Sequence, residues 1–273
     1  MPLLNIPIPT SEAVLFFYAI LVRVMGLFTV APLFSSKTLG PFVRVFLALF
    51  LSLNLSIIYQ KNYLTTDTVQ IFPHELFTPI GFILLSIKEF IIGYLIGFCF
   101  NLVLEALLLA GELIDNMVGF STAQFLDPLS NQSQALIGTI LLVVFGFVVL
   151  LEDWHLIFVI ALLKSFFIIP LGNITLNPDA FPVLTAAAST LFFTGIKIAA
   201  IPALLLFCAT VGIAFAVNST PNMSLLWMGF PIRFWTALFA LWIVSGQLFD
   251  LFGHAFQASS NLVESILPLL NIK

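Results

Sequence analysis

Charged side chains are scarce in this sequence. Its 273 residues include 9 lysines and arginines and 13 aspartates and glutamates, together 8% of the chain. Soluble domains carry about 25% charged residues, so these few cannot cover a water-facing surface. The composition therefore excludes an ordinary soluble enzyme and a disordered chain. Because there is no basic patch, it also excludes a nucleic-acid partner.

Residues that build disulfide, metal and catalytic sites are also few. Cys99 and Cys208 each lie inside an apolar run, whereas a disulfide framework or a zinc site needs more cysteines in polar loops. The three histidines are isolated, and no zinc-protease, phosphate-loop or nucleophile-elbow motif occurs. We therefore expect no cofactor, no metal and no enzymatic activity. The one compact polar cluster, Glu152 to His155, falls between two apolar runs, where tryptophan and charged groups favour the membrane–water boundary.

Long apolar runs make up most of the chain. Hydrophobic residues are 61% of it, and the mean hydropathy is +1.16. About 20 apolar residues span a bilayer as a helix, and the polar breaks between the runs are too short to form another domain. The sequence predicts one all-α domain that is a polytopic membrane protein. The runs cover residues 13–34, 42–60, 77–118, 135–151, 154–171, 180–217 and 225–252.

Two of these runs are too long for one crossing. Residues 77–118 would form a helix of roughly 60 Å at about 1.5 Å per residue, and residues 180–217 one nearly as long, whereas the hydrocarbon layer is about 30 Å thick. Either the segments break, with Gly93, Gly97 and Pro202 among the candidate positions, or they leave the bilayer while still buried. Gly93 and Gly97 also form a small-xxx-small pair, which permits close helix packing.

Charged residues interrupt the apolar runs. A charge at the bilayer centre costs ~2.5–3.5 kcal/mol on insertion scales, unless its stem lets it reach the headgroups. Their recurrence favours helices that face protein or a watery lumen. We therefore expect buried assembly contacts at Arg23, Lys88, Glu89, Lys164 and Lys197. Since Lys88 and Glu89 point about 100° apart on a helix, they are expected to have different partners.

A polar stripe follows part of residues 77–118. Asn101, Glu105, Glu112 and Asn116 are spaced 4, 7 and 4 residues apart. At about 100° per residue they lie within roughly 60° of one another on a helix. This face lines either a water-filled path or a seam between subunits, and the spacing alone does not choose between the two.

The segment after this stripe, residues 119–128, is too polar for lipid and too apolar for a free surface loop. Gly119 and Pro128 bracket it and weaken a helix at both ends. Such backbone survives at membrane depth only when it is buried in protein or lines a cavity. We expect a non-helical loop that projects into a lumen, with a turn packed in a subunit seam as the alternative. Its residues of interest are Gly119, Phe120, Ser121, Thr122, Phe125, Leu126, Asp127 and Pro128.

Several short motifs follow one another along nearly the whole chain. They are Leu21 to Val24 with Ala31 to Phe34, Val43 to Val45, Gly111-Glu112, Gly119 to Ser121, Phe125 to Pro128, Trp154 to Ile157, Ser165-Phe166 with Ile169 to Gly172, Ala200 to Pro202, Thr220 to Met223 and Gly229 to Pro231. Singly each motif is weak. In this order and spacing the chain resembles the FliR family of flagellar export-gate proteins, and more distantly the SctT proteins of virulence type III secretion.

The resemblance implies a non-enzymatic subunit of a protein export gate. Members of the family join several copies of FliP and FliQ, with FlhB nearby, in a helical channel complex through which unfolded export substrates pass. The resemblance implies long, partly broken helical hairpins, with a FliP-like part at about residues 1–175 and a FliQ-like part at about 176–273. It also implies a place in the bacterial inner membrane, in contact with the lipid bilayer, at the flagellar basal body, with part of the complex raised towards the periplasm.

The family also implies a role for residues 119–128, since its matching segment is a plug that closes the resting channel. The resemblance implies a plug that can present two phenylalanines, three residues apart. Phe125 matches the second, but Thr122 stands at the first, so Phe120 is the candidate substitute. In a further departure, residues 218–220 carry no basic side chain where the family often has one before its proline.

Three other functions stay open from the sequence. One is an SctT-type subunit of a virulence injectisome. Another is a secondary transporter with Glu105 or Glu112 as an acidic coupling site, although no internal repeat is evident. The third is a membrane-embedded enzyme, which would need a cluster of catalytic residues that the sequence does not display.

Overall fold

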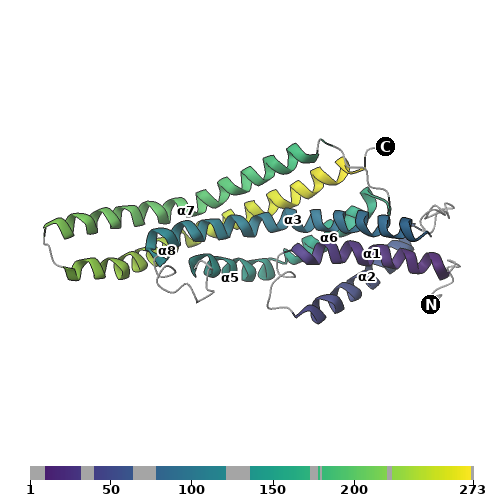
Figure 1. Cartoon of the computed structure of the whole chain (residues 1–273), viewed down its shortest axis with the longest axis horizontal. Helices are drawn as coiled ribbons and strands as arrows, with labels where there is room; N and C mark the ends of the chain where they lie inside the picture. The colour runs from purple at the N-terminus through teal and green to yellow at the C-terminus, as the bar shows by residue number, and fades with distance from the viewer. Residues whose placement is uncertain are drawn as a thin grey trace. The chain divides into compact units, whose positions relative to one another are not determined.

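The computed structural model describes residues 10–31, 40–63, 78–120, 136–172, 178, 180–219 and 223–271. In this part of the chain every regular element is an α-helix (Figure 1). The expected all-α class is therefore confirmed. The helices are α1 (Thr10–Val30), α2 (Pro41–Tyr63), α3 (Pro79–Val118), α5 (Leu136–Leu151), α6 (His155–Ile168), α7 (Ala180–Ser219) and α8 (Met223–Leu269).

Four helical stretches within the described ranges are long and apolar enough to cross a membrane, and α5 with α6 makes a fifth if the pair counts as one broken span. In lipid, a helix satisfies its backbone hydrogen bonds internally, which is why apolar runs of this length become helices. The expected polytopic membrane protein is confirmed. The four stretches are Pro41–Ile58, Pro79–Val118, Ala180–Ser219 and Gly229–Leu269.

The two longest predicted runs form unbroken helices. α3 and α7 each continue for 40 residues, so Gly93 and Gly97 do not break α3, and Pro202 lies inside α7. Each helix is about 60 Å long, which exceeds a hydrocarbon layer of about 30 Å by more than ordinary tilt absorbs. The structure therefore removes the first alternative, a break within either helix, and the extension of these helices beyond the bilayer stays a prediction. A break does occur between α5 and α6, where Asp153 has a φ of 55°.

Helix α8 continues beyond the apolar run of the sequence. The run ends near residue 252, whereas the helix continues to Leu269. Beyond residue 252 the average hydropathy falls because polar residues alternate with apolar ones, while the apolar positions keep a helical spacing. With Ser259 and the preceding Leu248 and Phe252, these positions make one buried face: Leu248, Phe252, Ala255, Phe256, Ser259, Leu262, Val263, Ile266 and Leu267.

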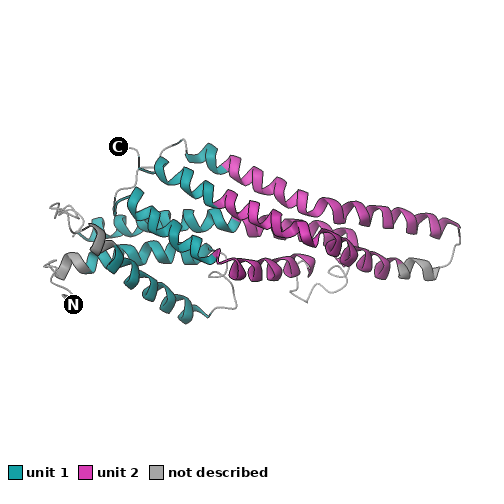
Figure 2. Ribbon diagram, turned by 180° about the vertical axis from the view of Figure 1, so that it is seen from behind, with its two compact units in different colours: residues 1–101, 155–184, 260–273 teal, residues 102–154, 185–259 magenta. Residues whose placement is uncertain are grey.

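The chain divides into two compact units (Figure 2). Unit 1 contains residues 1–101, 155–184 and 260–273, and unit 2 contains residues 102–154 and 185–259. The division cuts through α3, α7 and α8, because each of these long helices contributes to both units. It does not coincide with the FliP-like and FliQ-like parts implied by the resemblance, and that boundary near residue 175 stays a prediction.

In unit 1, three glycines bring α1 and α3 into backbone contact. A Cβ atom at Gly26 would lie 2.5 Å from the carbonyl oxygen of Phe90, and one at Gly97 would lie 2.8 Å from that of Leu27. A Cβ atom at Gly93 would overlap the carbonyl oxygen of Arg23. Only glycine permits this approach, so the Gly93–Gly97 pair does serve close helix packing.

Replacement of Gly93 by alanine tests this crossing. The added methyl group meets backbone that cannot rotate away, so we expect Gly93→Ala to lower the free energy of unfolding by about 1–3 kcal/mol. Unfolding by titration with a denaturing detergent measures the difference. Gly212→Ala is the matched control, because a Cβ atom there meets nothing within 4 Å. Equal stability of the two variants would contradict the close crossing.

Candidate functional site

A buried ion pair joins α1 to α3 inside unit 1. The Arg23 Nε atom lies 2.7 Å from Glu89 Oε2, and both side chains are 0% exposed. The glycine crossing fixes this geometry, because Gly93, which touches the backbone of Arg23, lies one helical turn after Glu89. Both side chains lie in the core of this chain, and their expected role as assembly contacts stays a prediction.

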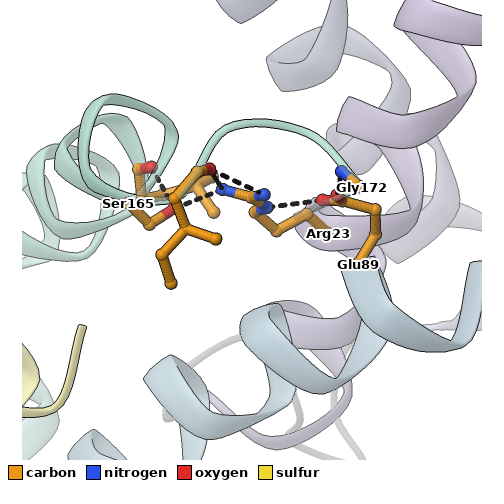
Figure 3. A network of polar contacts seen from close by, with 6 residues as sticks. Arg23, Glu89, Ser165 and Gly172 are labelled. Carbon is orange, nitrogen blue, oxygen red and sulfur yellow. Dashed lines mark hydrogen bonds and ion pairs between the residues drawn. The ribbon is translucent and has the colours of Figure 1, made fainter. Parts of the chain in front are cut away.

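The remaining donors of Arg23 are directed at α6 and its C-terminal end. The Nη1 atom donates to Ser165 Oγ at 3.2 Å, and both Nη atoms donate to the carbonyl oxygen of Ile169 at 3.3 Å. The guanidinium also lies over the ring of Phe166, 4.3 Å from its centroid. Figure 3 shows the guanidinium between Glu89 on one side and Ser165 on the other. Three helices of unit 1 therefore meet at one side chain.

Glu89 extends the network to the turn that follows α6. Its second oxygen, Oε1, accepts the N–H of Gly172 at 2.8 Å. Gly172 has a φ of 79°, which favours glycine. Helix α6 ends at Ile168, so the carbonyl of Ile169 has no partner within the helix, and Arg23 donates to it. Arg23 and Glu89 thus bind one backbone carbonyl and one backbone N–H of the chain that follows α6.

Of the three lysines expected as buried contacts, none is fully buried in this chain. Lys88 is half-buried and donates to the carbonyl oxygen of Gly172 at 3.2 Å. Lys88 and Glu89 therefore have different partners, as predicted, although both bind the same turn. Lys164 is exposed and pairs with Glu264, and Lys197 is exposed. The role of these lysines as assembly contacts stays a prediction.

The predicted polar stripe lies along α3. Glu105, Glu112 and Asn116 are exposed and Asn101 is half-buried, so an apolar helix presents carboxylates outside the core of unit 2. Whether this face meets a lumen or a subunit seam stays a prediction. Asp115, beside the stripe, is instead buried and accepts the N–H of Ile137 on α5.

Of the predicted loop residues, the structure describes Gly119 and Phe120. Gly119 ends α3 with a φ of 101°. The Phe120 ring packs edge-on against two rings of α8, with centroid distances of 5.4 Å to Phe230 and 6.0 Å to Phe234. The other predicted positions lie outside the described residues: Ser121, Thr122, Phe125, Leu126, Asp127 and Pro128.

The polar cluster at the α5–α6 break borders a hollow in unit 2. Trp154 stacks on Phe256 with a centroid distance of 5.0 Å, which anchors the turn to α8. Beside it, Glu152, Asp250 and His254 line an open hollow of about 320 Å³. These titratable side chains are exposed, and no group of three metal-ligating residues occurs in the described part of the chain.

Sequence reasoning missed the acceptors that complete the Arg23 network. Ser165 and Ile169 lie about 140 residues from Arg23 in the chain. A usable signal existed: a buried guanidinium has five donors, and one carboxylate cannot accept them all. A second missed residue is Asp115, which stands next to the stripe in sequence but faces the opposite environment.

The buried pair predicts that a single substitution in it costs much more unfolding free energy than a substitution in an exposed ion pair. Arg23→Gln or Glu89→Gln leaves one buried charge without its partner, which we expect to cost ~3–5 kcal/mol of unfolding free energy. The double variant should cost less than the sum by ~0.5–3 kcal/mol. Lys164→Ala, which breaks the exposed pair with Glu264, should cost less than about 1 kcal/mol. Additive single effects in a denaturing-detergent titration would argue against a coupled pair.

Comparison with known proteins places the chain in a family. Residues 14–259 match the model of bacterial export proteins, family 1. The flagellar biosynthetic protein FliR of Escherichia coli (strain K12) is 26% identical over 259 residues, covering 94% of this chain and 95% of that protein. Its namesake from Pectobacterium carotovorum subsp. carotovorum is 25% identical over 250 residues, covering 92% of each.

A more distant relative has the same name and similar coverage. The flagellar biosynthetic protein FliR of Bacillus subtilis (strain 168) is 20% identical over 259 residues, covering 94% of this chain and 96% of that protein. With its apolar helices, the chain is an integral membrane protein. It belongs to the bacterial export proteins, family 1, the family of the flagellar biosynthetic protein FliR.

Proposed function

We propose that this chain is a non-enzymatic subunit of the flagellar export gate. With FliP and FliQ it forms the channel through which unfolded flagellar substrates cross the bacterial inner membrane, next to FlhB at the basal body. The observation that carries this proposal is the match to the export family over residues 14–259. The relatives named above are all flagellar biosynthetic proteins, which favours a flagellar gate over a virulence injectisome.

The surface of α7 supports a function in an assembly. Only 22% of the most apolar 18-residue stretch of α7 is buried within the chain. Apolar surface of this extent marks contact with lipid or with another protein. The exposed apolar side chains of α7 include Phe181, Phe192, Phe193, Leu204, Phe207 and Phe215.

The polar stripe on α3 argues against lipid as the neighbour of that face. Exposed carboxylates at Glu105 and Glu112 are costly against hydrocarbon, so this face of α3 meets water or another subunit. A chain with wide apolar surfaces and a narrow acidic face suits a ring of subunits around a wet path. The length of α3 and α7 suits a complex raised partly out of the bilayer towards the periplasm.

Co-purification tests the proposed assembly. The full chain, expressed with tagged FliP and with FliQ from the same organism, should be recovered in one complex after mild detergent extraction. A transporter or enzyme would be isolated as a stable single-chain protein instead. Recovery of this chain alone, while FliP and FliQ still bind each other, would overturn the proposal.

Residues 119–128 are proposed to plug this channel, with Phe120 and Phe125 as apolar contacts of the seal. A fully buried phenylalanine contributes roughly 1.5–3 kcal/mol. A few such contacts therefore hold a channel closed and still yield to an arriving substrate. The charged residues Arg23, Lys88, Glu89, Lys164 and Lys197 are proposed to support assembly by fixing or presenting the surfaces that partners contact.

Deletion of residues 120–126 separates a plug from a seam. If the segment is a plug, the deletion variant should assemble with FliP and FliQ and make the membrane leaky to small ions, because the apolar seal is gone. If the segment is a seam, assembly should be lost without a leak. Ion flux into vesicles that contain the purified complex measures the leak, and a tight, fully assembled deletion variant would rule out the plug.

A further inference from the structure

Asp115 lies where α3 and α5 are joined inside unit 2, and it makes two separate contacts there. Its backbone carbonyl accepts the N–H of Gly119 at 3.0 Å. With Gly119 at a φ of 101°, this is the left-handed cap that ends a helix. Its side-chain carboxylate accepts the N–H of Ile137 at 3.0 and 3.2 Å, in the first turn of α5. One residue therefore caps both the end of α3 and the start of α5.

The carboxylate occupies the position of an N-terminal helix cap, although it comes from another helix. The first N–H groups of a helix have no partner within it, and a carboxylate there pairs with them and with the positive end of the helix dipole. The N–H of Gly138 is a further donor to Asp115. Asp115 is only 5% exposed, so water does not readily replace it at this helix end.

A glycine contact one turn away holds the same two helices together. A Cβ atom at Gly111 would overlap the Cα atom of Gly138, so the backbones of α3 and α5 touch. Gly111 and Asp115 are four residues apart and lie on one face of α3. The glycine contact brings the start of α5 against α3, and the carboxylate then reaches its N–H groups.

We propose that Asp115 is a positioning residue that locks the end of α3 to the start of α5. With this lock in place, α3 and α5 move as one body. On the proposed channel function, on which this part rests, the closed channel requires the lock, because its loss lets the end of α3 and the start of α5 shift apart.

Amide hydrogen exchange on the full chain in detergent tests the lock directly. Asp115→Ala should speed exchange at Ile137 and Gly138 by roughly tenfold, since a lost cap leaves buried donors without an acceptor. The internal reference is Val148 and Val149, which are buried in the same helix and should exchange as before. Unchanged exchange at Ile137, or an equal increase at all four amides, would overturn the lock.

Matched variants separate the lock from a general loss of stability. Asp250→Ala removes an exposed carboxylate from unit 2 and should leave exchange at Ile137 unchanged. Gly111→Ala forces the two backbones apart and should reproduce the effect of Asp115→Ala, whereas Gly246→Ala, in open space, should not. If Asp115→Ala is too unstable to purify, Asp115→Asn takes its place, because the amide side chain keeps one oxygen acceptor. Its exchange at Ile137 and Gly138 is compared with its exchange at Val148 and Val149 in the same way.

Ion flux through the complex with FliP and FliQ tests the functional part. Asp115→Ala should assemble and leak, while Asp250→Ala should assemble and stay tight. An assembled, tight Asp115→Ala complex with fast exchange at Ile137 would overturn the requirement of the lock for sealing. Failure of the unaltered chain to join FliP and FliQ would instead overturn the proposed function, and the exchange result would stand by itself.

Discussion

A guanidinium buried in an apolar helical protein constrains everything around it. It keeps its charge and carries five N–H donors, so removal from water is tolerable only if the protein supplies a counter-charge and enough acceptors. Arg23 obtains these from α3, α6 and the chain after α6. Because these acceptors belong to separate segments, they can converge only in one arrangement of helices, and the arginine therefore selects the packing of unit 1.

A glycine contact combined with a buried carboxylate occurs twice on α3, once in each unit. In unit 1, Gly93 allows close contact with α1, and Glu89, four residues before it, binds a buried donor. In unit 2, Gly111 allows close contact with α5, and Asp115, four residues after it, binds the first turn of that helix. The glycine sets the distance and the carboxylate sets the register. Apolar side chains alone would let two helices slide past each other, since dispersion contacts have little direction.

Composition predicted the class and the helices, because so few charges and such long apolar runs admit little else. It did not predict that α3 continues through Gly93 and α7 through Pro202. A glycine or proline breaks a membrane helix only if neighbouring groups fail to compensate for it. Arg23, Glu89 and Lys88 were recognised singly as anomalous. Their pairing was out of reach, because it depends on where α1 crosses α3, which is set by backbone contact at glycines. Asp115 was overlooked since its role depends on a helix that begins 21 residues later.

Two sets of charged groups in the described part of the chain have different physical consequences. Arg23, Glu89 and Asp115 are buried and satisfied by the chain itself, so they determine the fold without any partner. Glu105 and Glu112 are exposed on an otherwise apolar helix, where they lie outside the core and would be costly against lipid. The long helix α3 therefore carries both sets: its buried carboxylates hold neighbouring helices in register, and its exposed ones carry a cost wherever lipid, rather than water or protein, would face them.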